Sequence, residues 1–160
     1  MRTLRINCIL ILVMIMFTAC YELSDIIVDI PPPTPSEIPP FVITRPEFEI
    51  IGRPYYFNYA GIVFNFLNQA DNIVEKITVS FRLFDARTQD NPFIGSNLFQ
   101  ITVGDIIHPN ENKEIIISLD RFIHIAPSWP YIIDSFYISQ INYVGGRIWE
   151  DKYGKFRVRD

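Results

Sequence analysis

Apolar and polar positions alternate along several segments of this chain. Between Ile77 and Leu83, every second residue is apolar. A repeat of two residues is typical of a strand with one buried face. Alternation of this kind, or a short apolar run, predicts strands over residues 48–51, 60–68, 76–85, 98–103, 115–119, 131–144 and 147–158.

Polar and glycine-rich segments separate these strands. Residues 69–72, 87–92 and 109–113 are rich in Asn, Asp, Gln or Glu and predict turns or loops. Gly145 and Gly146 predict a two-residue hairpin, because paired glycines accept the positive φ angles of a primed turn. Within residues 131–144 the apolar phase shifts, which predicts an extra, bulged residue.

The predicted fold class is all-β. About seven short antiparallel strands with no sustained helical stripe fit a single immunoglobulin-like β-sandwich, which we place over residues 46–160. The Cys…Trp…Cys core of antibody domains is absent. Trp149 alternates with Arg147 after the hairpin, so we expect its ring to pack into the core.

The N-terminus has a different pattern. Arg2 and Arg5 precede an unbroken apolar run over residues 8–17. This order predicts a secretory signal over residues 1–19, since a membrane-spanning helix needs about 20 apolar residues. The alternative is a buried core helix, but the segment shows no amphipathic face.

The end of this run carries a recognisable motif. Phe17-Thr18-Ala19-Cys20 resembles the lipobox of bacterial lipoproteins, with Phe17 in place of the usual Leu; spirochaete lipoproteins are similar in tolerating such departures. The resemblance implies cleavage before Cys20 and attachment of diacylglycerol to its thiol. Cys8 is the only other cysteine and lies in the segment to be removed, so the mature chain has no cysteine pair for an internal disulfide.

A proline-rich stretch follows the cysteine. Residues 31–40 hold six of the chain's twelve prolines, which predicts an extended polyproline conformation of about 30 Å. We interpret residues 20–45 as the lipid-attachment cysteine and a linker that spaces the domain from a membrane. The alternative is a PxxP ligand for a recognition domain.

The charge balance limits the partners. The chain has 14 basic and 18 acidic residues, a net charge of −4. Residues 1–19 hold two of the basic residues and no acidic one, so the mature charge would be −6. Such a balance disfavours nucleic acid as a partner. It also means that the lipid on Cys20, and not charge, would hold the chain at a membrane.

A second resemblance covers about residues 60–149. Phe81-Arg82-Leu83-Phe84-Asp85 is similar to the F-x-L-Y-D signature of a bacterial β-sandwich family, with Phe84 in place of Tyr. Family members tend to have an apolar strand ahead of it, as in residues 61–66, and a proline turn after it, as in residues 109–115. The resemblance implies a fold and no chemistry.

Few residues suggest catalysis. The two histidines, His108 and His124, have Asp105 and Asp120 nearby, but neither spacing is diagnostic. No nucleophile elbow, zinc-protease motif or phosphate loop appears. We therefore expect no catalytic residue, no metal and no cofactor, and keep an envelope hydrolase with a His/Asp site as the alternative.

Aromatic residues are the more suggestive set. Tyr55, Tyr56, Trp129 and Tyr131 are candidate binding residues, because exposed Tyr and Trp are favoured anchors. The alternative is that they fill the sandwich or cover its open end. Together these features predict a non-enzymatic, extracytoplasmic lipoprotein of the cell envelope, whose domain binds a protein or glycan or supports envelope structure.

Overall fold

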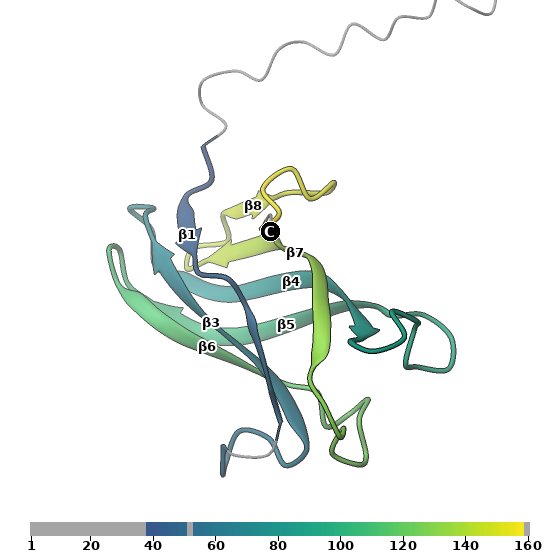
Figure 1. The fold of residues 1–160 in the computed structure, drawn as a ribbon. Coiled ribbons are helices and arrows are strands. Elements are labelled where there is room, and N and C mark those ends of the chain that lie inside the picture. The colour runs from purple at the N-terminus through teal and green to yellow at the C-terminus, as the bar shows by residue number, and fades with distance from the viewer. Residues whose placement is uncertain (1–37, 51–52, 159–160) are drawn as a thin grey trace, which may run out of the picture. The chain divides into compact units, whose positions relative to one another are not determined.

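Two antiparallel sheets pack face to face in the computed structural model of the chain (Figure 1), which describes residues 38–50 and 53–158. The predicted all-β sandwich is confirmed, with eight strands in place of about seven. They are β1 (Phe41–Ile43), β2 (Glu47–Ile50), β3 (Ala60–Asn68), β4 (Val74–Asp85), β5 (Leu98–Ile107), β6 (Asn112–Ser118), β7 (Tyr131–Tyr143) and β8 (Ile148–Glu150).

Some strands that follow one another in the sequence lie in different sheets. In the first sheet, β3 pairs with β1 and β2 along one edge and with β6 along the other. In the second sheet the order is β5-β4-β7-β8. β3 and β4 are therefore central strands, and each contains a run of five buried residues, because neighbouring strands cover both of its edges and the other sheet covers its inner face.

The inner face of β4 forms much of the core. Ile77, Val79, Phe81 and Leu83 are at most 1% exposed, whereas Arg82 on the other face is exposed. The Phe81 ring stacks on Phe99 and Phe136, with centroids 5.4 and 6.0 Å away. The faces of this strand are therefore those that its alternation predicted.

The sandwich begins before residue 46. β1 lies within the range interpreted as linker, yet Phe41 pairs with Asn68 on β3. Its ring is 3% exposed, stacks on Phe66 and meets Trp149 edge-on. The sequence hid this strand because it is only three residues long and lies between prolines. Trp149 packs against the core, as expected.

β7 contains the expected bulge and a second one. Thr78 and Val79 are adjacent on β4 but face Gln140 and Ile138, so Ser139 is an extra residue. A further register shift lies opposite residues 80–82, near Ser135, whose φ is 54°. Both irregularities keep the apolar residues of a 13-residue strand directed at the core.

The turn after β7 has three residues and not two. The Tyr143 amide donates to the Arg147 carbonyl at 2.9 Å, and the Gly146 amide donates to the Tyr143 carbonyl at 3.1 Å. Gly145 and Gly146 have φ angles of 94° and 86°. Both glycines thus adopt a positive φ as predicted, but Gly146 acts as a bulge residue after the turn.

The last strand is much shorter than predicted. β8 ends at Glu150, although residues 147–158 alternate like a strand. Asp151 is 6% exposed, and its carboxylate accepts backbone amides of Tyr153, Lys155 and Phe156 at 3.3, 3.0 and 2.9 Å. These hydrogen bonds curl the chain into a turn, which interrupts pairing with β7 until the Val158 amide donates to the Phe136 carbonyl at 2.8 Å.

Candidate functional site

Three long loops lie at one end of the sandwich, which we call the loop end. They span residues 53–59, 86–97 and 119–130 (Figure 1). They meet there because β2 and β3 pair up to Ile50 and Ala60, while the end of β4 pairs with the start of β7 through Asp85 and Tyr131. The first and third loops also touch, since the Asn58 amide donates to the Asp120 carboxylate.

The loop end concentrates exposed apolar side chains. Six of the fourteen large hydrophobic residues that are exposed in the described part of the chain lie on its three loops, and Leu98 and Ile132 lie at the adjoining strand ends. Ile94 and Tyr55 are fully exposed, and Ile125 is 83% exposed. Clustering of this kind marks an interaction surface more often than scattered single residues do. The other members are Tyr56, Tyr59, Leu98, Phe122 and Ile132.

Asp120 joins the first loop to the third. Its carboxylate accepts the Asn58 amide at 2.7 Å, the Asn58 side-chain amide at 3.0 Å and the Tyr59 amide at 2.9 Å. Desolvation alone would raise the pKa of Asp120, but these hydrogen bonds outweigh it and lower the pKa. The ionised carboxylate therefore fixes the loop that carries the tyrosines.

Asp85 joins the second loop to the third. One carboxylate oxygen accepts the indole N–H of Trp129 at 2.9 Å, and the other accepts the amides of Arg87 and Thr88 at 2.8 and 3.1 Å. The hydrogen bond from Trp129 lowers the pKa of Asp85 most, and those from the two amides lower it further. The Arg87 guanidinium lies over the indole, 4.5 Å from the ring centroid. In the sequence, Asp85 is the last residue of the motif that is similar to F-x-L-Y-D, and no local pattern pairs it with Trp129.

A hollow of about 400 Å³ opens between the second and third loops. Phe93, Phe99 and Phe122 line it, and the rings of Phe93 and Phe122 each meet Phe99 at about 5 Å. Ile94 and Ser96 stand at its rim. The hollow is mostly apolar and could receive an apolar side chain. Its residues come from separate loops, so no local sequence pattern pointed to it.

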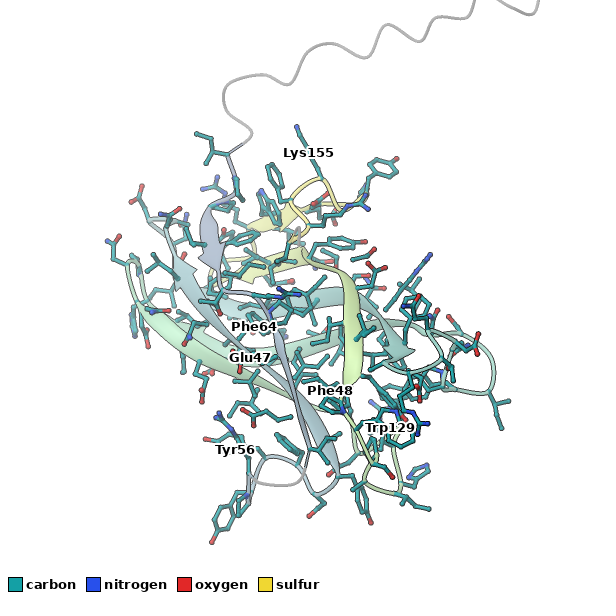
Figure 2. The ribbon with its side chains drawn as sticks, viewed as in Figure 1. Glu47, Phe48, Tyr56, Phe64, Trp129 and Lys155 are labelled. Atoms are coloured by element: carbon teal, nitrogen blue, oxygen red, sulfur yellow. The ribbon has the colours of Figure 1, made fainter. Side chains whose placement is uncertain are left out.

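The four predicted binding aromatics do not form one cluster. Tyr55 and Tyr56 project from the first loop, whereas Trp129 is half-buried beneath Arg87. Tyr131 is also half-buried and packs against Phe48 and Phe93. Figure 2 shows Tyr56 and Trp129 well apart at this end of the domain. Two of the four are thus free to contact a partner, and two support the loops.

The histidines lie at opposite ends of the sandwich. His108 is exposed in the turn between β5 and β6, and nearby Asp105 binds the Lys113 ammonium at 2.6 Å. His124 is exposed in the third loop, which forms no strand; of its apolar neighbours, Ile123 is buried, whereas Phe122 and Ile125 are exposed. Asp120, the carboxylate nearest His124 in sequence, is engaged by Asn58 and Tyr59.

Other expectations lie outside the described residues. Cys20, the signal segment and most of the linker precede residue 38. Within residues 38–50 and 53–158 no helix could cross a membrane, and no three His, Cys, Asp or Glu residues are grouped as metal ligands. Comparison with known proteins found no matching family model, no matching curated protein and no matching solved structure, so both resemblances stay predictions.

Proposed function

We propose that this chain is a non-enzymatic lipoprotein of the cell envelope, anchored through Cys20, whose β-sandwich binds a protein partner with its loop end. The observation that carries the proposal is the concentration of exposed apolar side chains on three loops held together by Asp85 and Asp120. Loops on a rigid scaffold are the usual carriers of binding function.

The chemistry of the loop end favours a protein over a glycan. Its most exposed residues include the aliphatic side chains of Ile94 and Ile125, beside the hollow lined by Phe93 and Phe122. Sugars are bound by hydrogen bonds together with stacking on a free aromatic face. Trp129 is less suited to stacking, because Arg87 lies over its ring.

The position of the loop end fits an anchored binding domain. β1 begins at Phe41, which pairs with Asn68, and the Gln69 amide donates to the Pro40 carbonyl. An N-terminal anchor would therefore join the sandwich at the end opposite the three loops. This arrangement leaves the loop end free of the point of attachment.

The anchor is tested by replacing Cys20. Cys20→Ala should abolish labelling with a radioactive fatty acid and release the chain from the membrane fraction, because one acylated cysteine is the whole attachment. Cys8→Ala, the matched control, should leave both unchanged. Labelling that persists in Cys20→Ala would refute the lipoprotein assignment.

The binding surface is tested by site-specific photo-cross-linking in cells that make the chain. A photoreactive residue at Ile94 or Ile125 should give the same adduct, and one at Val144, exposed at the other end, should not. The captured protein is then purified and titrated against Ile94→Ser/Ile125→Ser, for which we expect at least about tenfold weaker binding. Equal affinity of that variant and the parent would contradict the proposed site.

A further inference from the structure

β5 is the one long strand at an open sheet edge whose backbone is not shielded in the described part of the chain. It runs for ten residues and pairs along one side with β4. No strand in the described ranges pairs along its other side, which we call the β5 edge. Exposed edges of this length bind further strands unless a protein protects them.

The other edges have such protection. β1 and β2 are separated by Thr44-Arg45-Pro46, and proline cannot donate to a ladder. β8 is three residues long and stops at the Asp151 turn. β6 carries Lys113 and Glu114, and edge charges discourage pairing.

The β5 edge lacks these features. It has no proline and no lysine, and its single charge, Asp105, is neutralised by the Lys113 ammonium at 2.6 Å. The strand also exposes apolar side chains near its two ends, Leu98 and Ile106, which are 54% and 48% exposed.

Backbone geometry identifies the groups that the β5 edge presents. The Leu83 amide donates to the Asn97 carbonyl, so in this antiparallel ladder the odd-numbered residues of β5 face β4. The N–H and C=O groups of Gln100, Thr102 and Gly104 consequently point away from β4. The Leu98 carbonyl does the same, while the Leu98 amide is held by the Ser96 hydroxyl at 3.0 Å.

We propose that the β5 edge pairs antiparallel with β5 of a second copy of this chain, about a two-fold axis at Ile101. In this register Gln100 of each copy lies opposite Thr102 of the other, and Leu98 lies opposite Gly104. The outward N–H and C=O groups of Gln100 and Thr102 then pair with each other, and the Gly104 amide donates to the Leu98 carbonyl. The two β5-β4-β7-β8 sheets become one continuous eight-stranded sheet.

Charge and apolar contacts select this register. The sole charge, Asp105, faces Asn97 of the other copy, and no like charges meet. An axis at Thr102 would instead place Asp105 against Phe99, whose ring is buried. Ile101 and Val103 are only partly buried on the inner face of β5, and pairing about Ile101 covers both.

Single cysteines in the full-length chain test the register. Across a non-hydrogen-bonded pair the Cα atoms are about 4.5 Å apart, which a disulfide can span. Ile101→Cys should therefore form a covalent dimer under mild oxidation in membranes, reversed by reductant. Leu98→Cys, the matched control on the same strand, would lie about 20 Å from its own copy and should give only the background of the parent chain.

A proline substitution gives an independent test. Gln100→Pro removes an outward amide and leaves the bonds to β4, so it should keep the circular dichroism spectrum of the parent. Introduced into the Ile101→Cys chain, it should lower the dimer yield at least about fivefold. If Ile101→Cys yields no dimer, or Leu98→Cys cross-links equally, the proposed pairing is wrong.

Discussion

The two ends of the sandwich both fix their connections by hydrogen bonds to the backbone, but they differ in the length of those connections and in the side chains that they leave exposed. At the hairpin end, formed by the turns at residues 69–73, 108–111 and 144–147, short connections satisfy their own backbone groups. Asn68, fully buried, binds the carbonyls of Asn72 and Ile107 and the amide of Ala70. Its backbone also binds Glu111 and Asn110.

At the loop end, two carboxylates hydrogen-bond the backbone of the loops, as the Asn68 side chain does for the turns at the hairpin end. Asp85 and Asp120 accept loop amides and the Trp129 indole, so hydrogen bonds to the backbone hold the loops beside the few side chains that they bury, Phe57, Leu119 and Ile123. Residues such as Ile94 and Ile125 are left in solvent. The comparison teaches that a loop can be fixed by its backbone and still offer apolar side chains to a partner.

The largest effect should come from the core beneath the loop end. Phe81→Ala removes a fully buried ring that stacks on Phe99, which itself supports Phe93 and Phe122. We expect a loss of about 3–5 kcal/mol in the free energy of unfolding, measured by urea denaturation. Arg82→Ala, on the exposed face of the same strand, should change it by less than about 0.5 kcal/mol. The reverse order would mean that the faces of β4 are misassigned.

Replacing Asn68 should destabilise the hairpin end. Asn68→Ala leaves the carbonyls of Asn72 and Ile107 and the amide of Ala70 without a partner, which should cost about 2–4 kcal/mol of unfolding free energy. Asn65→Ala, an exposed asparagine on the same strand, is the control. Binding at the loop end should be unchanged in the folded fraction of Asn68→Ala; weaker binding would show that the two ends are coupled.

The loop end should instead be sensitive to acid. The pKa of Asp120 is lower in the folded chain than in the unfolded chain, so its stabilisation is present above about pH 4 and is lost as the pH falls through the folded value. Asp120→Asn should cost about 1 kcal/mol at pH 7 and show a smaller further loss between pH 5 and 3 than the parent. Equal acid sensitivity of Asp120→Asn and the parent would place the origin of that sensitivity elsewhere.

The smallest effect should be a gain in stability at Tyr55. This residue is fully exposed with a φ of 78°, a left-handed conformation that favours glycine. Tyr55→Gly should raise the free energy of unfolding by about 0.5–1 kcal/mol while weakening binding of the partner. Tyr56→Gly, without the positive φ, should weaken binding with no such gain. Destabilisation by Tyr55→Gly would show that the tyrosine ring packs on the folded domain.

Sequence reasoning located most strands because the apolar period is a local property. The inner residues of β4 and the bulge in β7 followed directly from it. It missed β1, which is too short to show a period, and overextended the last strand, because the Asp151 carboxylate ends β8 by binding amides further along the chain. It also did not separate the exposed Tyr55 and Tyr56 from the half-buried Trp129 and Tyr131, since a sequence does not show which aromatic rings are covered.

Local patterns in the sequence were enough to predict the fold class, the faces of the central strands and an anchored N-terminus. Each depends on spacing within a few residues, where the period of a strand or the length of an apolar run is decisive. Long-range packing sets which loops share an end, which carboxylates hold them and which side chains remain exposed. Asp120 and Asn58 are 62 positions apart and Asp85 and Trp129 are 44 apart, and such contacts exist only once both sheets have paired.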